Sequence, residues 1–376
     1  MKINADLHIH GKHSQGVSPK MEIPVIARES RKKGLDVVGT GDILNPKWMK
    51  HVRKQTDGTG LRKNNDIHFL LTAEVEDRNR VHHVLVFPSM SSVENAYSDF
   101  KQLSNDIRRE GRPRINASGE KIVKMAKKHD ALAGPAHAFT PYTGMYSKHD
   151  SIKNCYGEYT EEIDFLELGL SADSKMASKI SELEKLSFLS NSDAHSPWPY
   201  RIGREFNQFE IDNLNYSSIV KAITKGPEVN VGLDPREGKY HRTACNSCYK
   251  KYSLEEAEKI SWKCECGSTI KKGVKNRVEE LSDRPENLDL NYQYLPPLSN
   301  IIQKIVGHSS PNTKTVQKRW EKLNKAFGTE INILLHEEIS KLRRVDPEVA
   351  SAIQKFRNKE YSYEEGGGGK YGEIKI

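Results

Sequence analysis

Histidine and acidic side chains follow several short apolar runs of this sequence. The first run ends in ADLHIH, with His8 and His10, and the run LSFLS is followed by NSDAHS, with Asp193 and His195. A single Asp-x-His pair is also typical of a polar loop after a buried strand. Two such pairs at strand ends, Asp6 with His8 and Asp193 with His195, suggest a shared function. Asp42, Glu74 and His137 follow other predicted strands, and His83 lies within one.

Imidazole and carboxylate groups without cysteine suit divalent ions such as Zn²⁺, Mn²⁺, Mg²⁺ or Fe²⁺. Eight candidate ligands exceed what one ion takes. Two or three ions spaced ~3.5 to 4 Å apart fit the number better and are typical of phosphate ester hydrolysis. Such ions would lower the pKa of a bound water and neutralise phosphate charge. The carboxylates of Asp42, Glu74 and Asp193 are the expected catalytic groups.

The first 235 residues alternate between apolar runs and helix-like stretches. The predicted strands are 3–8, 35–40, 67–73, 81–87, 131–135, 163–169, 186–190 and 205–211, and the predicted helices are 24–33, 93–109, 119–129 and 174–185. This alternation favours a parallel sheet with helices outside it, either a β/α barrel or a doubly wound sheet. In a barrel the C-terminal strand ends share one face, so the histidines and acids would converge.

The alternation stops near residue 226, and we predict three parts. Residues 1–231 form the α/β domain, residues 240–284 a cysteine-rich module, and residues 285–376 a basic helical region with a glycine-rich tail. The stretch 232–239 is a plausible linker. The best helices of the last part are 298–306, 313–327 and 330–342, and the closing EEGGGGKYGEIKI is flexible by composition.

Four cysteines, in CNSC and CEC, predict a structural zinc ribbon. They are Cys245, Cys248, Cys264 and Cys266, and 15 residues separate the two pairs. The expected intracellular setting disfavours disulfides. Four thiolates leave no open position on the zinc, so this ion would fold the module and take no part in catalysis.

Positive charge gathers in the last two parts. The chain carries a net charge of +8, with 11 Lys and Arg against 7 Asp and Glu over 239–284, and 11 against 6 over 301–357. Basic residues mixed with aromatic ones suit phosphate contact and base stacking. The candidate DNA-binding residues are Lys250, Lys251, Trp262, Lys271 and Lys272. A solvated surface over ordinary core aromatics is the competing interpretation.

The remaining composition excludes two classes of protein. No apolar run approaches the ~20 residues of a membrane span, and the N-terminus has no secretory hydrophobic region. The sequence therefore predicts a cytoplasmic protein with no membrane partner.

The motifs ADLHIH, GTGD, TAEVED, HHVLVF, GPAHAF and SDAH resemble the PHP (polymerase and histidinol phosphatase) superfamily over about residues 1–225. The resemblance implies a distorted seven-stranded β/α barrel with a trinuclear site. The implied metal ligands are His8, His10, Asp42, Glu74, His83, His137, Asp193 and His195. Asp42 stands where the superfamily has a histidine, and His82 is expected to face away from the site.

The order of barrel, four-cysteine ribbon and basic helical region resembles one branch of the superfamily, the endonuclease Q family. This implies a metal-dependent DNA repair endonuclease that nicks duplex DNA, and possibly single strands, 5′ to uracil, hypoxanthine, xanthine or an abasic site. A small-molecule phosphatase of histidinol phosphatase type would leave the ribbon and basic tail without a role. A non-catalytic DNA-binding scaffold would leave the eight candidate metal ligands without a role.

Overall fold

The protein is described by a computed structural model that covers residues 1–375. Its centre is a nine-stranded mixed sheet with the order β13-β10-β9-β1-β2-β4-β5-β6, in which β3 also pairs with β4. These strands are β1 (Lys2–Asp6), β2 (Val37–Gly39), β3 (Leu61–Asn64), β4 (Ile67–Glu76), β5 (His82–Phe87), β6 (Leu132–Pro135), β9 (Phe206–Glu210), β10 (Val229–Gly232) and β13 (Tyr292–Tyr294). Strands β7 (Phe165–Glu167) and β8 (Ser187–Leu189) form a separate parallel pair.

All eight predicted strands are present, but the prediction of a parallel sheet is wrong. Strands β1, β2 and β4 run parallel, whereas β4, β5 and β6 are antiparallel neighbours, as are β1, β9 and β10. The link from β4 to β5 spans only residues 77–81, which suits a hairpin and is too short for a parallel crossover. The β7–β8 pair lies between β6 and β1, since Asp164 N donates to Ala133 O and Leu7 N donates to Asn191 Oδ1.

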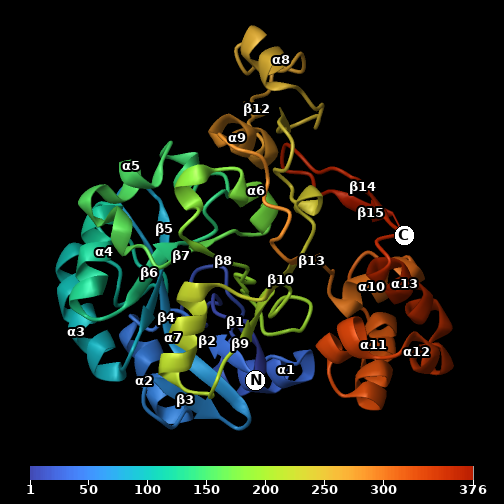
Figure 1. Ribbon diagram of the computed structural model, residues 1–376, viewed down its shortest axis with the longest axis horizontal. Helices are drawn as coiled ribbons and strands as arrows, with labels where there is room; N and C mark the ends of the chain where they lie inside the picture. Colours follow the sequence, from blue (N-terminus) through green and yellow to red (C-terminus); the bar gives the residue numbers. More distant parts are fainter. Residues whose placement is uncertain (376) are drawn as a thin grey trace.

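Helices surround this sheet (Figure 1). They are α1 (Ile23–Lys33), α2 (Pro46–Gln55), α3 (Met90–Phe100), α4 (Gly119–Lys128), α5 (Ile152–Tyr156), α6 (Ser174–Ser178) and α7 (Tyr216–Lys225). Helix α4 illustrates how the sequence specifies them: the Ser118 side chain caps its first turn, and Ile122, Val123 and Ala126 are buried. None of the helices in residues 1–375 is long and apolar enough to cross a membrane.

The cysteine-rich segment forms a small module that projects from the main body at the top of Figure 1. It contains β11 (Ala244–Cys245), α8 (Leu254–Lys259), β12 (Ile270–Lys271) and α9 (Val274–Leu281). Its core is small: Tyr252, Ala257 and Ile270 pack with two of the cysteines. So few apolar side chains need a further source of stability, such as a metal ion.

The chain returns to the central sheet after this module. Strand β13 pairs in parallel with β10, so the module is inserted between two neighbouring strands of one sheet. The proposed linker 232–239 includes the end of β10 and a short 3-10 turn, Pro235–Glu237. The three-part division of the sequence did not anticipate this return.

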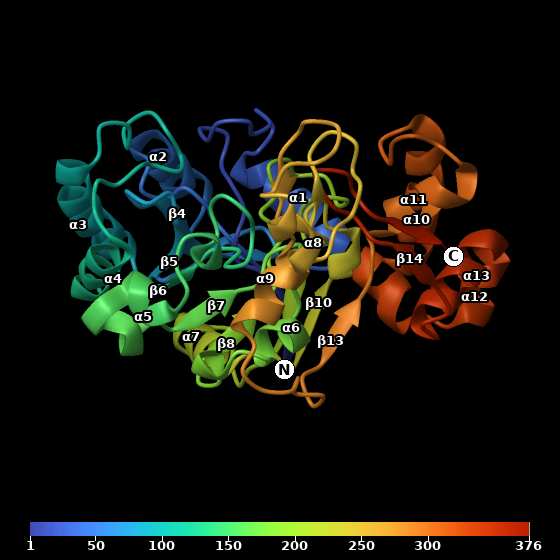
Figure 2. The same ribbon diagram turned by 90° about the horizontal axis from the view of Figure 1, so that it is seen from above.

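Four helices form the lobe at the right of Figures 1 and 2: α10 (Leu298–Val306), α11 (Lys314–Phe327), α12 (Ile339–Val345) and α13 (Pro347–Arg357). The first two match their predicted ranges closely. The predicted helix 330–342 is interrupted, because residues 332–336 are π-helical and Glu337 and Glu338 adopt extended backbone before α12. Helix α13 was missed, although Asp346 and Pro347 give it a capped start.

The prediction of a flexible glycine-rich tail is wrong. Strands β14 (Ser362–Glu364) and β15 (Glu373–Lys375) pair, and the glycines between them lie against residues 236–245. Gly366 N donates to Arg236 O, and Gly369 N donates to Lys239 O. Gly368 has φ +63°, and a Cβ there would lie 2.1 Å from the carbonyl oxygen of Cys245. Glycine therefore allows a close backbone approach at this position.

A buried ion pair joins the helical lobe to α1. Lys33 Nζ lies 2.6 Å from Glu330 Oε1, and the two side chains are 2% and 0% exposed. Glu330 also accepts hydrogen bonds from Leu298 N and Trp320 Nε1. Every partner is needed, because a buried charge without its counterion is costly.

Replacing Glu330 should therefore destabilise the protein far more than breaking a surface pair. We expect Glu330→Gln to lower the free energy of unfolding by about 3 to 5 kcal/mol, because Lys33 would be left buried without its counterion. The double variant Lys33→Met/Glu330→Gln should recover much of this loss. Urea unfolding at neutral pH measures both.

The control Glu94→Gln breaks an exposed pair with Arg53 and should cost less than about 1 kcal/mol of the free energy of unfolding. Equal effects of Glu330→Gln and Glu94→Gln would contradict a role for the buried pair.

Candidate metal centre

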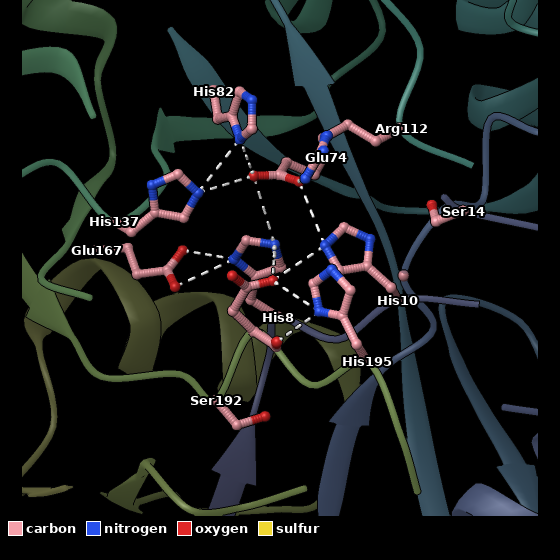
Figure 3. Close-up of polar contacts among 12 residues, drawn as sticks. His8, His10, Ser14, Glu74, His82, Arg112, His137, Glu167, Ser192 and His195 are labelled. Atoms are coloured by element: carbon pink, nitrogen blue, oxygen red, sulfur yellow. Dashed lines mark hydrogen bonds and ion pairs between the residues drawn. The ribbon is translucent and has the colours of Figure 1, made fainter. Parts of the chain in front are cut away.

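Three overlapping groups of histidines and carboxylates meet at one end of the central strands (Figure 3). Within each group the potential ligand atoms lie within 4.8 Å of one another. The groups are His8, His10 and Glu74; His10, Asp193 and His195; and Glu74, His82 and His137. Of the eight predicted ligands, the structure thus brings six together: His8, His10, Glu74, His137, Asp193 and His195. The other two, Asp42 and His83, lie elsewhere.

His8 is oriented toward the cluster by a carboxylate on the neighbouring strand β7. Its Nδ1 lies 2.8 Å from Glu167 Oε2, which leaves Nε2 facing Glu74 Oε1 at 3.8 Å. This Nε2 is buried and has no hydrogen-bond partner among residues 1–375. A buried unpaired imidazole nitrogen fits a position that coordinates a metal ion. Glu167 therefore orients His8 from outside the cluster.

Asp42 lies behind His10 and belongs to none of the three groups, so its predicted place among the ligands is wrong. Its Oδ1 is 3.0 Å from His10 Nδ1, while its Oδ2 accepts hydrogen bonds from Gly11 N and Ser14 Oγ. These partners turn the buried carboxylate away from the cluster and leave His10 Nε2 facing it. Asp42 fixes the ring of His10 and its protonation, as outer carboxylates commonly do for metal-binding histidines.

His82 faces the cluster and His83 faces away, the reverse of the prediction. The register of the antiparallel β4–β5 pair explains this, because Glu74 lies opposite Val84 and Val75 opposite His83. Opposed residues share a face and the faces alternate along a strand, so His82 shares the face of Glu74. His82 Nδ1 is 2.7 Å from Glu74 Oε1, whereas His83 Nδ1 pairs with Tyr156 Oη.

Asp193 and His195 close the cluster from the loop after β8. Asp193 Oδ1 is 3.0 Å from His10 Nε2, and the ring centroids of His195 and His10 are 4.6 Å apart, with the rings tilted by 57°. Asp193 has φ +46°, and His137 has φ +31°. Left-handed backbone at residues other than glycine is strained and is concentrated at functional sites. The fold thus holds these side chains in place at some conformational cost.

Without a metal ion the buried carboxylates and histidines share protons. Burial lowers the pKa of His8, but the charges of Glu167 and Glu74 outweigh this and hold it well above its usual value. Burial raises the pKa of Glu74, yet neighbouring histidines, chiefly His82 and His8, hold it well below its usual value. The carboxylates of the cluster lie close together, and their negative charge needs nearby positive charge. Metal ions can supply that charge, and their binding would release the histidine protons.

The four predicted cysteines also converge, at the end of the projecting module. The Sγ atoms of Cys245 and Cys266 are 3.5 Å apart, and so are those of Cys248 and Cys264. These separations are too long for disulfides and suit four thiolates around one tetrahedral zinc ion with Zn–S bonds of about 2.3 Å. The donor set therefore fits a structural metal.

The candidate DNA-binding residues lie on this module in different settings. Lys250 pairs with Glu265, and Lys272 pairs with Glu280. Lys271 Nζ lies 3.9 Å from the ring centroid of Tyr142, in the loop that follows His137. This contact links the module to the metal centre. Of the other candidates, Lys251 is exposed and Trp262 packs against the module core.

Comparison with known proteins shows which family contains this arrangement. A crystal structure of the lesion-specific endonuclease PfuEndoQ from Pyrococcus furiosus is 46% identical in sequence, with a TM-score of 0.95, over 100% of this chain and 96% of that one. A structure of endonuclease Q with a 27-mer duplex carrying an abasic lesion at the active site matches with the same identity and TM-score over 97% of that chain. This chain belongs to the endonuclease Q family. It is accordingly an enzyme of the metal-dependent endonuclease type.

Two curated relatives and one family model extend the comparison. Protein YqxK of Bacillus subtilis is 34% identical over 411 residues, which cover 100% of this chain and 99% of that protein. Protein MJ0043 of Methanocaldococcus jannaschii is 46% identical over 259 residues, 65% of this chain, and the match spans about a third (32%) of that longer protein. The model of the MJ0043 C-terminal domain matches residues 297–360, the helical lobe.

Substitution of the two adjacent histidines tests the register of this endonuclease Q centre. We expect His82→Ala to lose at least one bound metal ion, because its Nδ1 faces Glu74. His83→Ala should keep its full metal content and instead lose roughly 1 to 3 kcal/mol of stability, since Tyr156 would lack its partner. Metal analysis by mass spectrometry and thermal unfolding measure the two effects. Metal loss in His83→Ala with none in His82→Ala would contradict the register.

A second substitution tests whether the two metal sites are independent. Cys264→Ser should release the zinc of the cysteine module while the histidine cluster keeps its ions, because the ligand classes and segments differ. The matched control is Cys155→Ser, a buried cysteine outside both sites, which should release neither. Metal content per chain is the measurement. Simultaneous emptying of both sites by Cys264→Ser would show that they are coupled.

Proposed function

We propose that this protein is a DNA repair endonuclease that uses metal ions bound in a distorted seven-stranded β/α barrel. Its proposed action is to cut the phosphodiester 5′ to deaminated bases (uracil, hypoxanthine, xanthine) and to abasic sites in duplex DNA. The single observation that carries the proposal is the convergence of three histidine and carboxylate groups on Glu74 and His10. Full-length similarity to an endonuclease Q solved with abasic duplex DNA supports the choice of substrate.

The proposed ligands are His8, His10, Glu74, His82, His137, Asp193 and His195. Two or three divalent ions, Zn²⁺, Mn²⁺, Mg²⁺ or Fe²⁺, when bound would supply Lewis acidity to the phosphate and a more acidic water. Glu74 belongs to two of the groups and is placed to bridge between them. The outer carboxylates Glu167, Asp42 and Glu76 fix the rings of His8, His10 and His82.

The remaining residues of the chain would bind and select the DNA. An enzyme that reads a damaged base must take that nucleotide out of the stack, which costs a few kcal/mol and costs least where pairing is already damaged. Damaged sites would therefore be favoured by the duplex itself. The basic cysteine module, with Lys271 beside the loop that follows His137, supports a role in holding the phosphate backbone.

Two other functions fit fewer of the observations. A small-molecule phosphatase would need the metal centre alone, yet the similarity to endonuclease Q structures extends through the cysteine module and helical lobe. A non-catalytic scaffold would have no need of strained backbone at Asp193 and His137 or of seven converging ligands.

The decisive assay incubates the purified protein and Mg²⁺ or Mn²⁺ with labelled duplexes that carry uracil, hypoxanthine, an abasic site or no lesion. Nicking of the damaged duplexes alone is the expected result. Asp193→Asn should abolish nicking and leave lesion-DNA binding within about tenfold, since it removes a negative charge from the metal centre and no DNA contact.

The contrasting outcomes separate the alternatives. Hydrolysis of a small phosphomonoester with no nicking would favour the phosphatase, and salt-dependent DNA binding without any hydrolysis would favour the scaffold. Equal loss of binding and nicking in Asp193→Asn would make Asp193 a residue needed for folding.

A further inference from the structure

The segment RREGRPR, residues 108–114, brings a cluster of positive charge to the rim of the metal centre. It holds four arginines and one acid within seven residues and lies in the irregular stretch between α3 and α4. It contains none of the candidate metal ligands, and no motif of the sequence marks it. It lies beside the centre because both of its ends are fixed there.

One end is held against the loop that carries His10. Gly111 N donates to His13 O, and Asn45 Nδ2 donates to Glu110 O. A Cβ on Gly111 would lie 2.1 Å from Ser14 Oγ and 2.5 Å from Asp42 Oδ2. The segment thus packs directly on the carboxylate that orients His10, at a distance that only glycine allows.

The other end pairs with the end of β4. Glu76 N donates to Pro113 O, and Ile115 N donates to Glu76 O. Arg114 Nε lies 3.1 Å from Glu76 Oε1, so this arginine is already paired. Arg112 lies between the two fixed ends, and its backbone position is therefore set by the same strand that carries Glu74.

Arg112 reaches into the cluster, as Figure 3 shows. Its Nη1 is 3.2 Å from Glu74 Oε2, an oxygen that also lies 3.3 Å from His10 Nε2. The side chain is 31% exposed, and its other guanidinium nitrogens make no hydrogen bond within residues 1–375. A planar group with five N–H donors and one protein partner retains donors for an anion.

A cavity adjoins this guanidinium. It has a volume of about 330 Å³, and its lining includes Arg109, Arg112, Arg114, Ser14 and Gln15. Arg109 is exposed and has no ion-pair partner within residues 1–375. Three carboxylates, those of Glu76, Asp106 and Glu110, also line the cavity, so its lining carries no excess of positive charge. Glu76 is paired with Arg114, and Asp106 accepts hydrogen bonds from Ser104 Oγ and Arg114 N. The free guanidinium donors of Arg112 and Arg109 are therefore the groups that can bind a phosphate oxygen here.

We propose that Arg112 is a catalytic residue of the DNA cleavage proposed above, in which its guanidinium binds a non-bridging oxygen of the scissile phosphate, and that Arg109 binds the adjoining phosphate of the same strand. The inference rests on the proposed function. In the reaction, the oxygen of water forms a bond to phosphorus and loses a proton to solvent, while the phosphorus–oxygen bond to the leaving sugar breaks and that sugar oxygen takes up a proton from solvent. Arg112 neither gives nor takes a proton; it stabilises negative charge on the phosphate oxygens in the transition state.

The test compares Arg112→Met, Arg112→Lys and the control Arg108→Met in metal-loaded protein. Arg108 is exposed in the same segment and does not line the cavity. We expect Arg112→Met to slow single-turnover nicking by about 10²- to 10³-fold, the usual effect of removing one such donor. Arg112→Lys should recover part of the rate, and Arg108→Met should cut at the wild-type rate.

Two further measurements do not depend on nicking. Metal content should be unchanged in all three variants. Binding of inorganic phosphate, measured by calorimetry, should weaken at least tenfold in Arg112→Met and remain at the wild-type value in Arg108→Met, because one charge-assisted contact is worth a tenfold change or more.

Several outcomes would overturn the proposal. Loss of metal in both Arg112→Met and Arg112→Lys would make Arg112 a structural counterion of Glu74. Wild-type nicking or wild-type phosphate binding by Arg112→Met would remove it from the phosphate site. If the unaltered protein fails to nick any duplex, the proposed function fails; unchanged phosphate binding in Arg112→Met would then refute the arginine site separately, and weakened binding would support a phosphate site for another substrate.

Discussion

The burial of Glu74 imposes the main constraint on this structure. Its carboxylate is 1% exposed and lies within 4 Å of nitrogen atoms of five side chains: His8, His10, His82, Arg112 and His137. A buried carboxylate is tolerable only when positive charge and hydrogen bonds compensate for its lost hydration. The compensating groups come from four separate parts of the chain: the segment after β1, the start of β5, the loop after β6 and the segment 108–114. The strands, the hairpin and the arginine segment must all be in place before the charge is balanced.

This constraint accounts for the outer layer of carboxylates. Three carboxylates, Glu167, Asp42 and Glu76, each contact one histidine: His8, His10 and His82 in turn. In each ring the contacted nitrogen is the one that does not face Glu74. They fix which nitrogen faces inward, so the cluster presents lone pairs in fixed directions. The centre is therefore preorganised by hydrogen bonds that the fold supplies, and a bound cation would find its ligands already oriented.

Much of this could be predicted from the sequence, because strand ends and residue types are local properties. The eight strands, the first two lobe helices and six of the eight ligand positions followed from apolar runs and the residues after them. The choice between His82 and His83 did not, since it depends on the register of β5 against β4. The role of Asp42 depends on Gly11 and Ser14, which turn its carboxylate toward His10. Arg112 carries no motif, and only the pairing of residues 113–115 with the end of β4 brings it to Glu74. The return of β13 to the sheet is likewise a long-range pairing.

The contact between Gly368 and Cys245 also bears on the order in which the protein can mature during synthesis. The four cysteines leave the ribosome at least 100 residues before the glycine run that packs against their module. The four thiols can gather early, but the surface that supports them is completed only when residues 366–372 emerge. In a nascent chain, the cysteine module would therefore lack the backbone contacts that residues 366–372 supply. Loss of the chain from Gly366 onward would leave every candidate metal ligand in place and remove the backbone contacts that support this module.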